Sequence, residues 1–279
     1  MRPLVTTSAK QILNHDGNDA SISKAWVERF IKGLPDDLKP PKTRSTKKKR
    51  LDASDQETLE LWYERLRAVI ANVSPENIYN FGDTIFQIGE GMKPRTYCEW
   101  ITTIEFIAAD GWVAGPLTVV QGHSYFEHWF SSEGTRGRAL FMMSPSGRVG
   151  EQACMQMDRT KDRAPDGQPR LLLFRGQPQY LSFKFLDFCE QHKIIPFSFP
   201  PNIGHLMQPF DGNPFQDYKQ YWKSQGFSPV IDDVDEEKTY FFQGLSTVRE
   251  TSFKPDVITI AFADRGIVPF DPSKVGQPL

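Results

Sequence analysis

The sequence predicts a mixed α/β fold, in which a single β-sheet is covered by helices. Three observations support this prediction. After Pro75, three segments rich in Ile, Phe, Val and Thr follow one another, as strands of one sheet do. Residues 170–199 then give a strand, a helix and a strand, the order that joins parallel neighbours. Residues 235–266 carry helical patterns, which would cover the sheet.

Length and composition limit the number of domains and the classes of function. The chain has 279 residues, of which 39% are hydrophobic and 13% aromatic, enough to build one large domain or two small ones. The formal net charge is −2, so the chain does not bind nucleic acid by its overall charge, and any such role needs a local basic patch. The three cysteines are far apart and form no CxxC pair, which argues against a disulfide framework or a zinc site.

Targeting signals are not recognisable in this sequence. The first residues, MRPLVTTSAKQIL, lack the apolar segment of a signal peptide. No apolar run has the length needed to cross a bilayer. We therefore expect a soluble intracellular protein that has no contact with membranes.

The N-terminal part predicts a helix over residues 23–32. Ser21 or Ser23 would cap it, and Gly33 with Pro35 would end it. Its apolar side chains fall on one face: Trp26, Val27, Phe30 and Ile31. The charged side chains fall on the opposite face: Lys24, Glu28, Arg29 and Lys32.

A basic run follows, and then a second helix. Six cationic residues occur between positions 42 and 50 without an acid, and two prolines precede them, which indicates a linker or arm. They are Lys42, Arg44, Lys47, Lys48, Lys49 and Arg50. A capping box from Ser54 to Glu57 then predicts an amphipathic helix that ends near Val73.

The remaining elements are predicted from their residue periodicity. We expect strands over residues 77–89, 100–111, 117–122, 170–174 and 193–199. We expect helices over residues 180–192, 214–224, 235–250 and 254–266. The fourth strand, in RLLLFRG, ends in Arg175, and residues just past such a strand are where α/β proteins place their chemistry.

Five segments in order resemble one protein family. They are SKAWVERFI, NIYNFGDTIFQIG, TTIEFIAADGWVAGPLTVVQG, PPNIGHLMQPFD followed by FQDYKQYW, and AFADRGIVPFDPSKV. Together they resemble the pogo-like branch of the mariner superfamily of transposases, most closely the fungal kind. That family pairs a CENP-B-type helix-turn-helix with a DDE endonuclease domain of the RNase H-like fold.

The resemblance implies a domain organisation. Residues 1–35 would be a partial CENP-B-type helix-turn-helix, a small all-α remnant. Residues 36–75 would be the basic linker and a connecting helix. Residues 76–279 would be the DDE domain, an RNase H-like mixed sheet flanked by helices.

The chemistry of that family requires three carboxylates, which hold two Mg²⁺ or Mn²⁺ ions around a phosphodiester. The family motif on the first strand is Asn-hydrophobic-Asp-Glu-Thr-Gly-Phe, and it aligns with residues 80–86. The metal-binding Asp is replaced by Gly82, and Asp83 stands where the family has Glu. Because side chains alternate along a strand, Asp83 would point away from the site unless a bulge intervenes.

The second carboxylate position is also changed. The family pattern Leu-Leu-Asp-Gly-His aligns with residues 173–177, which puts Arg175 at the Asp position and Gln177 at the His position. Asp211 aligns with the third carboxylate, in the mid-thirties spacing that the superfamily uses. A guanidinium about 4 Å from a cation costs about 4 kcal/mol per unit charge at an effective dielectric near 20. We therefore expect no metal or cofactor, with Asp211 as a remnant that pairs with Arg175.

Two other polar residues near these motifs have structural explanations. His205, in GHLMQP, would either contact the site or be an ordinary structural histidine, and the second interpretation is favoured. Asp110, in AADG, is typical of a turn residue rather than a catalyst.

Three functional hypotheses follow. The first is a catalytically inactive, transposase-derived protein of the nucleus that binds double-stranded DNA through Lys24, Arg29, Lys32 and the basic run. The run would alternatively be a nuclear-import signal or a solvated linker. The second hypothesis is an active endonuclease that uses Asp83, Asp211 and another acid. The third is a relic or a protein-interaction scaffold. The sequence leaves the oligomeric state open.

Overall fold

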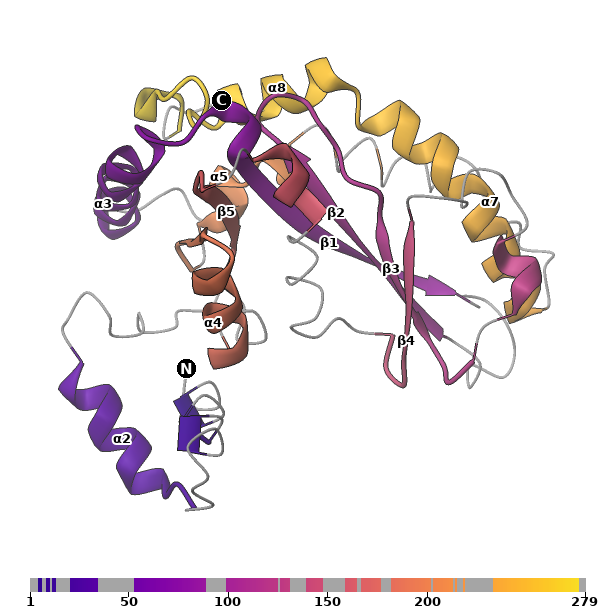
Figure 1. Cartoon of the computed structure of the whole chain (residues 1–279), viewed down its shortest axis with the longest axis horizontal. Coiled ribbons are helices and arrows are strands. Elements are labelled where there is room, and N and C mark those ends of the chain that lie inside the picture. The colour runs from indigo at the N-terminus through magenta and orange to yellow at the C-terminus, as the bar shows by residue number, and fades with distance from the viewer. Residues whose placement is uncertain are drawn as a thin grey trace.

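A computed structural model of the chain describes residues 5–6, 9–10, 12–13, 21–34, 53–88, 99–124, 126–130, 139–147, 159–164, 167–176, 182–201, 203–212, 214, 218 and 233–275. Most of these residues form one sheet with helices on both faces (Figure 1). The mixed α/β prediction is therefore confirmed. The basic run and most of the predicted helix over 214–224 lie outside the described residues.

The sheet has six strands in the order β4-β3-β2-β1-β5-β6. They are β1 (Ile78–Ile88), β2 (Glu99–Ala108), β3 (Leu117–Gln121), β4 (Leu140–Ser144), β5 (Arg170–Arg175) and β6 (Ile194–Phe199). Strands β1, β2 and β3 form an antiparallel meander, whereas β5 runs parallel to β1 and β6 runs parallel to β5. The five predicted strands are present, and β4 is an additional edge strand parallel to β3.

Helix α4 (Phe183–Gln191) covers one face of the sheet, next to β5 and β6. Ser182 caps it by accepting a hydrogen bond from the Phe185 amide, as Ser commonly does at this position. Phe185 is fully buried and packs edge-on against Phe174 of β5. This face therefore has an aromatic core that includes Tyr79 and Phe81 of β1.

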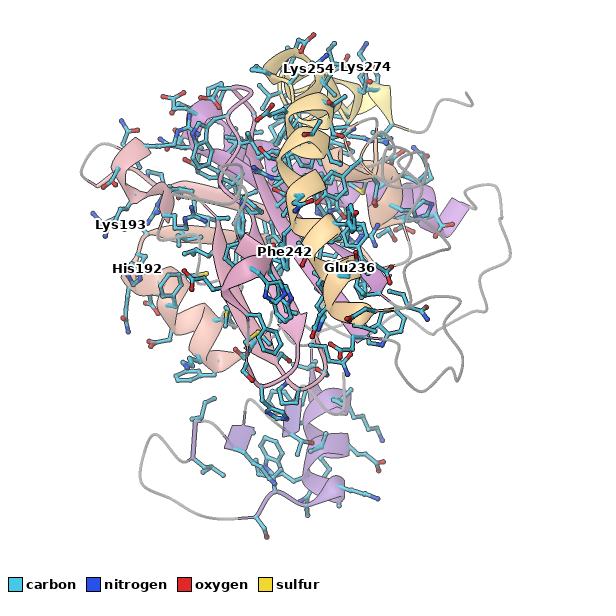
Figure 2. All side chains as sticks on the ribbon, turned by 90° about the vertical axis from the view of Figure 1, so that its right-hand side faces the viewer. His192, Lys193, Glu236, Phe242, Lys254 and Lys274 are labelled. Atoms are coloured by element: carbon cyan, nitrogen blue, oxygen red, sulfur yellow. The ribbon has the colours of Figure 1, made fainter. Side chains whose placement is uncertain are left out.

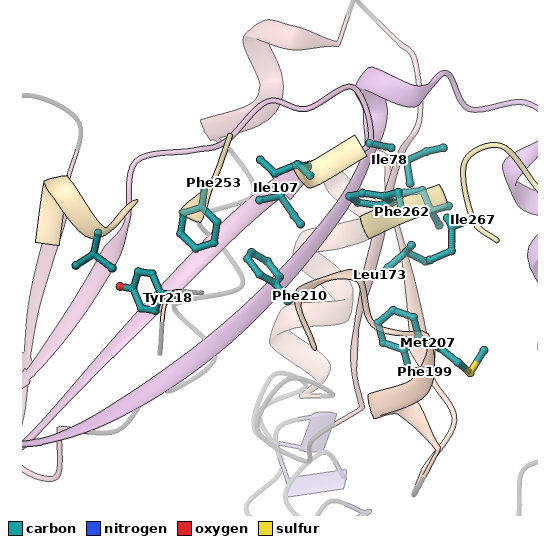
Figure 3. Close-up of a cluster of buried hydrophobic side chains, with 14 of the residues drawn as sticks. Ile78, Ile107, Leu173, Phe199, Met207, Phe210, Tyr218, Phe253, Phe262 and Ile267 are labelled. Atoms are coloured by element: carbon teal, nitrogen blue, oxygen red, sulfur yellow. The ribbon is translucent and has the colours of Figure 1, made fainter. Parts of the chain in front are cut away.

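The opposite face is covered by α3 (Ala53–Ile70), α7 (Val234–Ser252) and α8 (Pro255–Asp264), which form an arc in Figure 1. Figure 2 looks onto α7 as it crosses in front of the strands. Phe242 of α7 is fully buried and packs against Phe141 of β4. Figure 3 shows the central part of this core, where Phe210 and Phe253 meet above the strands.

Two helix details differ from the sequence expectations. Helix α3 begins at Ala53, so Ser54 lies inside the helix and not at its N-cap. In α2 (Lys24–Gly33), Ser23 is the cap as expected, but only Val27 of the predicted apolar face is buried. Trp26 and Phe30 remain 39% and 45% exposed and stack on each other, with ring centroids 5.3 Å apart. The apolar face of this helix therefore shows an aromatic pair to solvent.

Candidate functional site

The alternation of side chains along β1 (Ile78–Ile88) decides whether Asp83 faces the candidate site. The β1–β2 register is continuous from Tyr79 to Ile88, so no bulge interrupts it. Asn80 accepts a hydrogen bond from the Phe210 amide, which places even-numbered positions, including Gly82, on the face that carries α7 and α8. Asp83 shares the other face with Phe81, next to α4. The predicted orientation of Asp83, away from Asp211, is therefore what the strand geometry gives.

Strand β5 brings Arg175 to the same face as Gly82. Asn80 pairs with Leu173, the last pair of the parallel register, and Gly82 and Arg175 each lie two residues further along their strands. Leu171 and Leu173 point into the core that faces α8, and Arg175 has the same parity. The two positions that the resemblance aligns with metal ligands thus lie on the same face of adjacent strands.

A buried asparagine fixes the third position relative to these strands. Asn80 is 0% exposed, and its Nδ2 donates to the Leu173 carbonyl at 2.8 Å. Its Oδ1 accepts from the Phe210 amide at 3.3 Å, in the short helix η8 (Pro209–Asp211). One side chain therefore joins β1, β5 and η8. Each polar atom of a buried amide needs such a partner, so this position has a structural reason to be Asn.

Arg175, Gln208 and Asp211 form a polar cluster above this anchor. Arg175 Nε donates to Gln208 Oε1 at 2.7 Å, and a terminal guanidinium nitrogen donates to Asp211 Oδ2 in an ion pair. Gln208 is buried and donates from Nε2 to the Phe81 carbonyl at 3.2 Å. The Arg175 side chain is 44% exposed and that of Asp211 is 22% exposed. The cluster therefore presents a fixed guanidinium to solvent.

The donor set does not fit a two-metal centre. Hard cations such as Mg²⁺ take oxygen ligands, and this group offers one carboxylate, already paired with a guanidinium. Arginine offers only donors and stays protonated, so it repels a cation. Among the residues that the structure describes, no group of three His, Cys, Asp or Glu side chains is placed to hold a metal ion.

A second arginine–carboxylate pair lies on the same sheet face and was not predicted. Glu105 of β2 is 0% exposed and sits opposite Gly82 in the register. Arg249 of α7 donates from Nε to both of its carboxylate oxygens, at 2.9 and 3.1 Å, and from a terminal nitrogen to the Ala114 carbonyl. Burial raises the pKa of the Glu105 carboxyl, and the Arg249 guanidinium acts in the opposite direction. An isolated Glu in the apolar run TTIEFIAA was the signal for this pair, since buried acids are almost always paired.

The residues predicted to contact DNA are only partly within the described residues. Lys24, Arg29 and Lys32 are exposed on α2. The six cationic residues of the run, Lys42, Arg44, Lys47, Lys48, Lys49 and Arg50, lie outside the described residues.

The remaining two candidates occupy surface positions. His205 is exposed in the short helix α5 (Gly204–Met207). Asp110 accepts a hydrogen bond from the Trp112 amide at 3.1 Å, which is the Asx-turn geometry expected for this residue. It also forms an ion pair with Arg163. Neither residue joins the cluster around Arg175.

Comparison with curated proteins gives a distant relative. No protein-family model matches the chain. A protein described as the MFS-type transporter clz9 of Cochliobolus lunatus is 23% identical over 229 residues, which cover 75% of this chain. The match covers 25% of that protein, so the chain spans about a quarter of its length. In the described part of the chain, no helix has both the length and the apolarity of a membrane span.

Comparison with solved structures identifies the fold. The Mos1 transposase catalytic domain, in a structure with raltegravir and magnesium, is similar with a TM-score of 0.50 and 10% identity, over 85% of this chain and 100% of that one. A pre-cleavage Mos1 transpososome gives a TM-score of 0.50 and 11% identity, over 98% of this chain and 75% of that one. The six-stranded mixed sheet flanked by helices thus has the RNase H-like fold of the Mos1 transposase catalytic domain.

Proposed function

We propose that this protein is a transposase-derived, DNA-binding protein whose DDE-like domain no longer cleaves DNA. The observation that carries this proposal is the Arg175–Asp211 ion pair. It occupies the edge of the sheet where the family resemblance places the second and third metal ligands. Gly82, on the adjacent strand, supplies no ligand in place of the first. A site that binds metal cations needs ligands that attract them, whereas this edge holds a guanidinium that stays positively charged.

DNA binding is supported by the kind of fold and by the basic residues. Some of the fold neighbours are DNA-processing assemblies, such as the pre-cleavage transpososome. On this chain, Lys24, Arg29 and Lys32 are exposed on one helix, and six further cations follow in the run from Lys42 to Arg50. Phosphate contacts by such side chains give salt-dependent affinity. Because the proposed ligand is DNA, we place the protein in the nucleus.

The finer affiliation belongs to this proposal as well. The pogo-like branch, the CENP-B-type character of residues 1–35, and boundaries near residues 35 and 75 rest on the sequence resemblance. The single buried apolar side chain of α2, Val27, suggests that this helix needs a partner surface to be stable. Duplex DNA is one such surface.

The test combines binding with cleavage. Fluorescence anisotropy with a labelled duplex should show binding that weakens as NaCl rises from about 50 to 200 mM. The same duplex, incubated with Mg²⁺ or Mn²⁺, should stay uncut. A variant with the six cations of residues 42–50 changed to Gln should bind more weakly, with a smaller salt dependence.

Metal-dependent strand cleavage that Asp211→Ala abolishes would support an active endonuclease instead. A folded chain without DNA affinity at low salt would favour a scaffold or relic.

A further inference from the structure

The edge of the sheet around Arg175 has the properties of a phosphate site rather than of an inert remnant. Arg175 uses its Nε and one terminal nitrogen to contact Gln208 and Asp211. A guanidinium has five N–H donors, and the remaining ones have no partner among the described residues. With 44% of the side chain exposed, these donors face solvent. Arg175 is therefore oriented by the protein and still able to donate.

The orientation of Arg175 is fixed from beneath. Gln208, which accepts from Nε, is 3% exposed, and its own amide donates to the Phe81 carbonyl of β1. Asp211 holds the other end of the guanidinium from η8, which is itself bonded to the buried Asn80. A cation whose rotamer is already set loses less entropy when it binds an anion. This arrangement favours bidentate recognition of a phosphate.

A second guanidinium lies close to the segment that holds Asp211. A Cβ added to Gly212, directly after Asp211, would lie 3.6 Å from a terminal nitrogen of Arg265. Arg265 follows α8 and is partly exposed, and it forms no ion pair within the described residues. Two arginines therefore approach the Asp211–Gly212 segment, Arg175 through the Asp211 carboxylate and Arg265 at Gly212. Of these two, only Arg175 is paired with Asp211.

We propose that Arg175 and Arg265 together bind one backbone phosphate of duplex DNA at this edge of the sheet. The inference rests on the proposed DNA-binding function and adds a contact that is distinct from α2 and the basic run. The guanidinium groups supply directly the positive charge that metal ions would otherwise supply to a phosphodiester. Asp211 acts as a positioning residue for Arg175 and partly offsets its charge.

The experiment is a salt titration of duplex binding by single and double variants of the full chain. Each phosphate contact contributes about 0.9 to the slope of log K against log salt. Because the two arginines share one phosphate, the Arg175→Gln, Arg265→Gln double variant should reduce that slope by about 0.9 and weaken binding about tenfold at low salt. Each single variant should weaken binding and reduce the slope by part of that amount. Asp211→Asn keeps an oxygen that can accept from Arg175 but removes a negative charge from the phosphate site, so it should instead strengthen binding.

The matched control is Arg163→Gln. Arg163 also pairs with an aspartate, Asp110, but it packs against Tyr79 and Trp112 on the other face of the sheet. The Arg163→Gln variant should keep the salt slope of the unaltered chain. Circular dichroism melts of all variants should confirm that they fold.

The outcomes separate this inference from the function on which it rests. Binding by the unaltered chain, with slopes unchanged in both Arg175→Gln and Arg265→Gln, would overturn the inference and leave the DNA-binding function standing. A weaker affinity of Asp211→Asn would also count against it, because a merely structural ion pair predicts that sign. Absence of binding by the unaltered chain would contradict both.

Discussion

The two arginine–carboxylate pairs on the same face of the sheet differ in burial and therefore in what they do. Glu105 and Arg249 meet in the interior, where the carboxylate is 0% and the arginine side chain 17% exposed. Arg175 and Asp211 meet at the edge, where the side chains are 44% and 22% exposed. A buried charge that loses its partner is costly, whereas an exposed pair contributes little. The interior pair thus serves stability, and the edge pair is free to serve binding.

The largest expected effect comes from removing the interior arginine. Arg249→Met leaves the Glu105 carboxylate buried without its partner, and we expect a loss of about 3–5 kcal/mol in the free energy of unfolding. The matched variant Arg175→Met should cost at most about 1 kcal/mol. Urea denaturation followed by circular dichroism measures both. Equal losses would remove the distinction between the two pairs.

The interior variant should also depend on pH. Without Arg249, only the Tyr218 hydroxyl opposes the effect of burial on Glu105, so the pKa of this carboxyl in the folded state rises further. An acid whose folded pKa lies above its unfolded value destabilises the fold as pH rises from the unfolded value, about 4.3, through the folded one. The stability gap between Arg249→Met and the unaltered chain should therefore be wider at pH 7 than at about pH 4.5. A gap that does not change with pH would indicate that Glu105 is solvated or paired differently.

Placing carboxylates at the two aligned edge positions should create metal binding. Gly82→Asp combined with Arg175→Asp places two acids beside Asp211, on one face of adjacent strands. Mn²⁺ at a hundredfold excess over its dissociation constant would stabilise this variant by about 2.7 kcal/mol. Thermal melts with and without Mn²⁺ measure the effect, and the Asn/Asn double variant is the control. If Mn²⁺ stabilises neither variant, the edge is not a dismantled metal site.

The smallest expected effect concerns Asp271, a surface carboxylate. It serves as a reference for how much such an acid contributes to the stability of the fold. It accepts hydrogen bonds from the Ser273 hydroxyl and amide, which lower its pKa. Its contribution to stability is therefore present above its ordinary pKa, near 4, and is lost as pH falls through the lowered folded value. Asp271→Asn should be slightly less stable than the unaltered chain at pH 6 and indistinguishable from it near pH 2. A difference that persists in acid would assign the effect to something other than this charge.

Sequence periodicity was sufficient for most of the fold. Five strands and the main helices were predicted because β-branched alternation and amphipathic spacing are local signals. Strand β4 was missed because Leu140–Ser144 is short and half-exposed at the sheet edge, without alternation. The apolar face of α2 was predicted from its spacing, but spacing alone does not specify a partner surface, and Trp26 and Phe30 on that face are exposed.

The residues of the candidate site also divide into those that a local sequence pattern predicts and those that it does not. The opposite orientations of Gly82 and Asp83 followed from the two-residue period of a strand, which holds wherever no bulge occurs. The Arg175–Asp211 pair, 36 positions apart, was reached only through the family alignment. Glu105 and Arg249 are 144 positions apart, and no local pattern links them. Arg265 gave no signal either, because its position beside Gly212 is set by the packing of α8 on η8.

Isothermal calorimetry with Mn²⁺ tests the central claim most directly. The unaltered chain, in which Gly82 and Arg175 stand at the positions that the resemblance aligns with two metal ligands, should give no saturable heat of binding. The Gly82→Asp, Arg175→Asp variant should bind Mn²⁺, and Asp211→Ala in that background should abolish binding. Two-site Mn²⁺ binding by the unaltered chain, lost in its Asp211→Ala variant, would contradict the account and indicate a working metal centre.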